Sequence, residues 1–226
     1  MKTGKTAEVL FASSDMYQAL GYFLCRTEPE LVRALCDGSY VSDIRGILGE
    51  LGFPDSEIAE LTEGFSEFLT DSDERQDALF HLIRRDYTNL FTNPKISVMT
   101  PYESRFLGEE TIVEGAAPIR GIRTDVKNFY ARVGFESSFK PKEYEDHMRV
   151  EFEFMQVLRK NQGISVRNDD ESSYQQIEST IQMFFERHFK VWSLAFFEDV
   201  VSKSLENAYK VMGRVALAFL EQEFKR

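Results

Sequence analysis

Apolar residues along the chain recur mostly at intervals of three and four positions, and stretches in which apolar and polar residues alternate are scarce. Spacing of three and four places side chains on one face of an α-helix, whereas alternation is typical of a strand. The pattern therefore predicts an all-α fold. We expect a single globular bundle of about nine or ten helices with one long ordered loop.

Several of the expected helices have recognisable ends. Pro29 fits the first turn of a short helix, and Ser42 or Asp43 can cap the next one. Ser72 precedes a helix whose first turn is acidic, which suits the positive end of the helix dipole. We expect a break in the last helix at about residues 201–204. The expected helices lie at about residues 7–26, 29–35, 43–51, 58–69, 72–93, 122–134, 142–162, 170–187 and 189–224.

The stretch from Asn93 to Gly121 holds three of the six Pro and three of the thirteen Gly, so we expect a long ordered loop there. Loops of this length in compact domains are usually functional or disordered. Because this stretch also carries many apolar residues, it should pack onto the surface. We treat residues 1–226 as one domain, with a possible sub-division into 1–121 and 122–226.

The composition is that of a globular protein that is rich in aromatic rings, with 20 Phe and 9 Tyr. These rings either form the core or line a groove. The net charge of −11 disfavours nucleic acid and anionic lipid as partners. It is compatible with a role in solubility or with a cationic ligand such as a basic peptide.

The N-terminus has no apolar stretch followed by a small-residue cleavage site, and no 18 apolar residues run together. We therefore expect a cytoplasmic protein without membrane insertion. Cys25 and Cys36 stand on separate expected helices without a CxxC pattern, which predicts free thiols.

Catalytic and metal-binding motifs are missing from the sequence. None of His81, His147 and His188 has Glu three residues before it, as a di-iron helical bundle requires. No phosphate-binding loop or nucleophile elbow is present. We expect His81 to be a packed or surface residue and His188 to suit a helix C-terminus by its charge. The sequence thus predicts no enzyme, no metal and no cofactor.

Three segments, in order and spacing, resemble the TorD/DmsD family of redox-enzyme maturation chaperones. Residues 85–104 hold a helix end and a proline-rich loop, residues 145–155 begin with Glu145-Asp146-His147, and residues 188–192 run from His188 to Trp192. The family often has proline immediately before Asp-His, whereas Tyr144 and Glu145 occupy that stretch here.

This resemblance implies a system-specific chaperone that assists folding, cofactor insertion and export of a client. The client would be a molybdopterin oxidoreductase subunit, bound through its twin-arginine signal peptide, as the apo-subunit, or both. The chaperone would be a monomer or a homodimer. The resemblance and the residue types together suggest that the peptide-binding residues are Tyr87, Leu90, Phe91, Pro101, Tyr102, Glu103, Ser104, Asp146 and His147.

Other interpretations of these residues remain open. The stripe of Tyr87, Leu90 and Phe91 has helical spacing and could be core. Asp146 could simply cap a helix, and His147 could be an exposed imidazole. Two rival functions also remain: a helical assembly module that reads no leader, and a metal-dependent helical enzyme. Guanine-nucleotide binding has been attributed to the family, but no phosphate-cradling motif here supports it.

Overall fold

The computed structural model describes residues 6–92, 98–108, 120–139 and 143–225. Within these ranges the regular elements are helices and no strand is present, which confirms the all-α prediction. The elements are α1 (Ala7–Phe23), α2 (Pro29–Cys36), α3 (Ser39–Glu50), α4 (Asp55–Thr62), η1 (Glu63–Phe68), α5 (Asp73–Tyr87), η2 (Thr88–Thr92), α6 (Glu103–Gly108), α7 (Arg120–Val133), α8 (Met148–Arg167), α9 (Glu171–Phe184), η3 (Phe185–Phe189), α10 (Lys190–Lys203) and α11 (Asn207–Lys225).

Local signals in the sequence explain several helix ends. Pro29 stands at the first turn of α2, and the Ser72 hydroxyl accepts a hydrogen bond from the Arg75 N–H at the start of α5. The carboxylate of Asp170 does the same for α9 by accepting from the Ser173 N–H. Each of these caps satisfies a backbone group that the first turn of a helix leaves without a partner.

The start of α3 differs from the prediction. α3 begins at Ser39, before the predicted cap at Ser42 or Asp43, because Gly38 takes the left-handed conformation with a φ of 80°. Glycine adopts this conformation without the steric penalty that a Cβ brings. The turn between α2 and α3 is therefore tighter than the apolar spacing alone suggested.

The start of α8 is also different. The predicted helix at about 142–162 begins instead at Met148 and runs to Arg167; residue 142 itself lies outside the described residues. The Met148 N–H donates to the carbonyl of Pro101 at 2.8 Å, so the residues just before α8 are held by another part of the chain. This non-local bond explains why helix propensity failed to place the boundary.

The predicted long loop is described only in part. Residues 98–108 end in the short helix α6, which the sequence did not indicate. Residues 93–97 and 109–119 lie outside the described residues, and the expected packing of Ile112 and Val113 falls there.

The chain divides into two compact units, each made of two stretches of sequence. Unit 1 comprises Met1–Gly21 and Thr100–Phe196, and unit 2 comprises Tyr22–Met99 and Phe197–Arg226. The expectation of one domain, with a sub-division into 1–121 and 122–226, stays a prediction.

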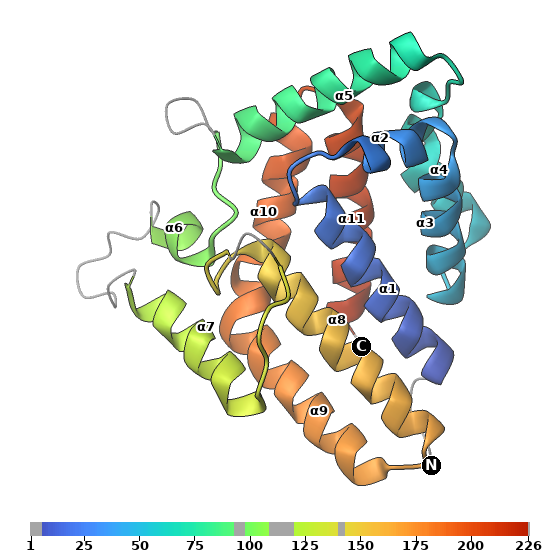
Figure 1. The fold of residues 1–226 in the computed structure, drawn as a ribbon. Coiled ribbons are helices and arrows are strands. Elements are labelled where there is room, and N and C mark those ends of the chain that lie inside the picture. Colours follow the sequence, from blue (N-terminus) through green and yellow to red (C-terminus); the bar gives the residue numbers. More distant parts are fainter. Residues whose placement is uncertain (1–5, 93–97, 109–119, 140–142, 226) are drawn as a thin grey trace. The chain divides into compact units, whose positions relative to one another are not determined.

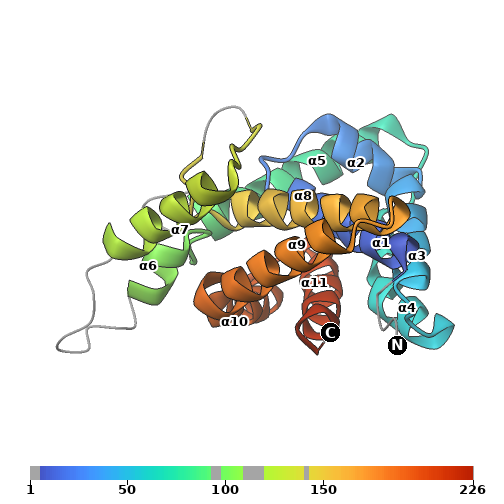
Figure 2. The same ribbon diagram turned by 90° about the horizontal axis from the view of Figure 1, so that it is seen from below.

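In unit 1, α8 and α9 lie side by side, as Figures 1 and 2 show from two directions. Their apolar faces bury an interlocking set of rings: Phe154 lies 4.9 Å from Phe184, and Phe152 lies 5.6 Å from Tyr17 of α1, between ring centroids. Aromatic pairs at such distances stabilise a core beyond the area they bury. The aromatic residues of unit 1 thus build much of its core.

In unit 2, α11 packs against α4 and η1. The predicted break in the last long helix is confirmed, since α10 ends at Lys203 and α11 begins at Asn207. The carboxylate of Asp86, which is buried on α5, accepts hydrogen bonds from the N–H groups of Leu205 (3.2 Å) and Glu206 (2.9 Å). Asp86 therefore satisfies backbone donors at the start of α11 from a distant helix.

Candidate functional site

Two segments of unit 1 are joined through their backbones just before α6 and α8. Tyr102 and His147 form an isolated antiparallel bridge. The Glu103 N–H donates to the carbonyl of Asp146 at 2.9 Å, and the Met148 N–H donates to the carbonyl of Pro101. We call this paired region, residues 101–104 with 146–148, the clasp. It brings together six of the nine residues predicted from the sequence.

Asp146 caps α6 and not the helix that follows it. Its Oδ2 accepts hydrogen bonds from both the backbone N–H of Ser104, at 3.1 Å, and the hydroxyl of Ser104. The carboxylate is buried, and among the described residues its Oδ1 has no hydrogen-bond partner. Asp146 is therefore a helix cap, as one interpretation of the sequence held, but it caps α6 and not the helix that follows it.

His147 is the N-cap residue of α8. Its Nδ1 accepts a hydrogen bond from the Arg149 N–H at 3.0 Å, which requires this nitrogen to be unprotonated. Burial, with a smaller contribution from the Arg149 charge, lowers the pKa of His147 to about 3. His147 is therefore a buried neutral imidazole, and its interpretation as an exposed one is wrong.

Tyr102 is the partly exposed member of the clasp. Its ring meets the His147 ring edge to face at 4.8 Å, and its hydroxyl donates to Glu143 at 2.9 Å. Burial and the Glu143 carboxylate raise the pKa of the Tyr102 phenol. Tyr144, which is 48% exposed, lies 6.0 Å from Tyr102, and the Arg123 guanidinium lies 3.5 Å above the Tyr144 ring. The outward side of the clasp, with the adjoining residues 143 and 144, thus carries two tyrosines and an acid, and a guanidinium group lies over each ring, from Arg105 on Tyr102 and from Arg123 on Tyr144.

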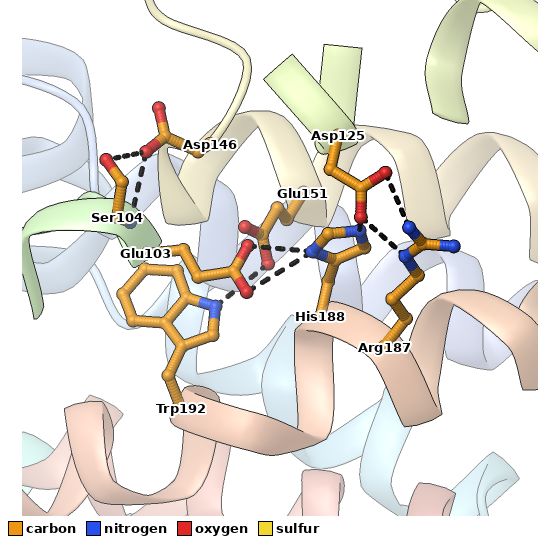
Figure 3. A network of polar contacts seen from close by, with 8 residues as sticks. All are labelled: Glu103, Ser104, Asp125, Asp146, Glu151, Arg187, His188 and Trp192. Atoms are coloured by element: carbon orange, nitrogen blue, oxygen red, sulfur yellow. Dashed lines mark hydrogen bonds and ion pairs between the residues drawn. The ribbon is translucent and has the colours of Figure 1, made fainter. Parts of the chain in front are cut away.

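Glu103, the first residue of α6, points inward. Its carboxylate oxygens lie 3.1 and 3.3 Å from Nδ1 of the buried His188, as Figure 3 shows. On the other side of the ring, Nε2 lies 3.4 Å from the carboxylate of Asp125 on α7. The Arg187 guanidinium also donates to that carboxylate, at 2.8 Å. His188 therefore ties α6 and α7 to η3.

Glu151 of α8 lies beside this pair. Trp192 donates its indole N–H to Oε2 of Glu151 at 3.2 Å, and the Glu151 side chain is completely buried (Figure 3). Burial, and then repulsion by the Glu103 carboxylate, raises the pKa of Glu151 well above its usual range. Burial also raises the pKa of Glu103, whereas the hydrogen bond to His188 acts to lower it.

His188 lies in a π-helical turn. η3 follows α9 directly, and the Lys190 N–H donates to the carbonyl of Phe185, five residues earlier. Such π turns insert one residue into an α-helix and are frequent at functional sites. The sequence assigned His188 only to a helix C-terminus. The signal that could have found this role was the spacing of His188 and Trp192, which puts both on one helix face.

The remaining predicted residues, Tyr87, Leu90 and Phe91, belong to unit 2. Leu90 and Phe91 lie in the π-helical turn η2 and are buried. The Phe91 ring packs 5.4 Å from Tyr87 and 6.1 Å from Tyr209, between centroids. Leu90 and Phe91 are thus core residues of unit 2, which agrees with the alternative that this stripe is core. Tyr87 is half-buried beside them.

Within the described ranges, no group of three or more His, Cys, Asp or Glu side chains is arranged to hold a metal ion. None of the described helices combines the length and the apolar character needed to span a bilayer.

A family model described as nitrate reductase delta subunit matches residues 54–198, a range that contains all three segments on which the TorD/DmsD resemblance rests. No curated protein matches the chain. Among solved structures, the chain is similar to the crystal structure of a candidate redox enzyme maturation protein from Archaeoglobus fulgidus. The identity is 20%, the TM-score is 0.48, and the match covers 98% of this chain and 97% of that chain.

Proposed function

Because the chain belongs to the nitrate reductase delta subunit family, a TorD-like family of redox-enzyme maturation chaperones, we propose that it holds a molybdopterin oxidoreductase subunit during assembly. Members of this family are chaperones and not catalysts. The chaperone would act in the cytoplasm, before cofactor insertion and export of the client. It would recognise the client's twin-arginine leader, its apo form, or both.

The observation that carries the proposal is the outward side of the clasp. Tyr102 and Tyr144 present aromatic rings there, and Glu143 lies within 2.9 Å of the Tyr102 hydroxyl. Aromatic side chains offer a large contact area at low conformational cost, and a carboxylate can bind a guanidinium. This combination suits a peptide that is apolar along most of its length and basic at one end.

The buried members of the predicted site have a different role in this proposal. Glu103, Ser104, Asp146 and His147 are buried and bonded within unit 1, so they hold the clasp in place and do not contact the peptide. Asp146 and Glu103, which the sequence suggested as peptide-binding residues, would therefore leave the contact with the arginines of the leader to other carboxylates. We assign that contact to Glu143, with Glu145 held nearby by Arg123 at 3.2 Å.

Binding should be modest, because ordering a flexible leader offsets part of the gain from burying it at about 25 cal/mol per Å². A chaperone that must release its client needs no more. The net charge of −11 adds a long-range attraction for a basic leader, which should weaken as salt rises.

The proposal is tested by purifying the tagged chain from its own cells and identifying the bound subunit by mass spectrometry. A synthetic peptide of that subunit's N-terminus is then titrated into the chaperone by calorimetry. We expect saturable binding that weakens with salt. If a client lacking its leader binds equally well, the protein is an assembly module without leader recognition, and if no redox subunit is captured the proposal fails.

A further inference from the structure

Three buried carboxyl groups of unit 1 lie close enough to interact with one another, and one of them faces an imidazole. Glu103 comes from α6, Asp146 from the clasp and Glu151 from α8, and all three side chains are at most 2% exposed. The buried His188 of η3 faces Glu103 (Figure 3). Three ionised carboxylates in this position would leave excess negative charge away from water, which is strongly unfavourable.

The hydrogen bonds show which carboxyl group is least able to stay ionised. Asp146 accepts two hydrogen bonds from Ser104, and Glu103 faces His188. Glu151 receives only the indole N–H of Trp192 on Oε2, and its Oε1 has no partner among the described residues. A buried carboxylate with one neutral donor is poorly stabilised, whereas the neutral acid loses little there.

We propose that Glu151 is a proton-binding site: it is a neutral carboxylic acid in the folded protein, and loss of its proton opens the buried contact between α6 and η3. While Glu151 is neutral, Glu103 can stay ionised opposite His188. When Glu151 ionises, the two carboxylates repel each other. The side chain of Glu103 would then turn away from Glu151, while the Glu103 N–H keeps its backbone bond to Asp146 in the clasp.

Groups from each surrounding element act on this proton. Glu103 and Asp146 favour the neutral acid by repulsion, while the Trp192 N–H favours the ionised form. Tyr130 of α7 is also close enough to interact with Glu151, and burial keeps its phenol neutral by raising its pKa. His188 acts through Glu103, whose charge it stabilises.

The sign of the pH dependence follows from the raised pKa of Glu151. The folded state holds this proton at pH values where the unfolded chain has lost it. The folding equilibrium constant should therefore fall by up to about tenfold per pH unit, from the unfolded pKa near 4.5 upwards to the folded pKa. Below the unfolded pKa both states are protonated, and the contribution of this group no longer changes.

The test compares urea unfolding of the full chain between about pH 5 and about pH 9 for the wild type, Glu151→Gln and Glu198→Gln. Gln copies the shape of the neutral acid, so Glu151→Gln should remove most of the alkaline loss of stability. Glu198 is exposed on α10, and its replacement should leave the pH profile unchanged. Equal alkaline slopes in the wild type and Glu151→Gln would overturn the proposal.

Two further measurements remain decisive if Glu151→Gln fails to fold. Infrared spectroscopy of the wild type should show the C=O band of an undissociated carboxyl group near neutral pH, lost on alkaline titration; absence of that band near neutral pH refutes the idea. Trp192→Phe removes the donor that favours ionisation, so the alkaline midpoint should move to higher pH. A shift of this midpoint to lower pH, or a loss of stability that is the same at every pH, would contradict the proposal. None of these measurements involves a client, so their outcome is independent of the proposed function.

Discussion

The carboxylate of Asp146 caps the helix that begins beside Ser104, 42 residues earlier in the chain, by accepting both the N–H and the O–H of that serine. Sequence reasoning assigned the same carboxylate to the helix that follows it. His147 caps that helix instead, through Nδ1. The pair Asp146-His147 thus fixes the starts of two helices at once.

Replacing Asp146 should therefore test the stability of α6. Asp146→Ala removes two buried hydrogen bonds, and we expect it to lower the free energy of unfolding by about 1 to 3 kcal/mol. Asp146→Asn keeps an acceptor oxygen and should cost less. Urea unfolding measures both, and an unchanged midpoint for Asp146→Ala would show that the cap contributes nothing. Because this variant is destabilised, it is a poor probe of peptide contacts.

The exposed ring of Tyr144 is a better probe of client binding. Tyr144→Ala should weaken binding of the client leader at least about fivefold, since aromatic residues at the centre of an interface dominate its energy. Stability should change little, because the ring is 48% exposed. Tyr22→Ala, with a ring that is 56% exposed on α1, is the matched control and should leave affinity intact. Equal affinities for both variants would exclude this surface.

His147 should make the protein less stable in acid. Its pKa is about 3 in the folded state and 6.5 in the reference state, so between these values the unfolded chain binds the proton and the folded protein does not. Stability should fall as the pH is lowered through this window. His147→Asn can still cap α8 and should flatten that part of the profile. His81→Asn replaces an exposed histidine and should leave the pH profile unchanged. If both variants flatten the profile equally, the loss of stability in acid does not come from His147.

Asp86 should anchor the start of α11 in the same way from α5. Asp86→Ala leaves the N–H groups of Leu205 and Glu206 without their acceptor and should cost about 1 to 3 kcal/mol. Asp77 lies on the same helix and is exposed, so Asp77→Ala is the control. Hydrogen exchange should show faster opening at the start of α11 only for Asp86→Ala. Unchanged protection there would contradict this role.

The sequence was sufficient for features that depend on near neighbours. Apolar spacing placed most helices, and Ser72 marked a helix start because a cap acts within one turn. The resemblance located the clasp residues. It could not tell that Asp146 turns towards Ser104, since that contact depends on how distant segments meet.

The features that the sequence did not reveal depend on tertiary packing. The π turns η2 and η3 each shift the helical phase by one residue, and the apolar pattern of three and four tolerates such a shift without a visible sign. Glu151 likewise gave no signal of its own. A glutamate inside an otherwise apolar helix is ordinary on an exposed face, and only the structure shows that this one points into the core.

The clasp also sets an order of events during synthesis. Ser104 and Asp146, which join its two segments, are 42 residues apart, and Glu103 and His188 are 85 residues apart. Contacts between positions so far apart carry a loop-closure cost and form only after the intervening helices have been made. A ribosome must therefore translate the chain past His188 before this surface is complete. The nascent protein should be unable to engage a client until its own folding is nearly finished.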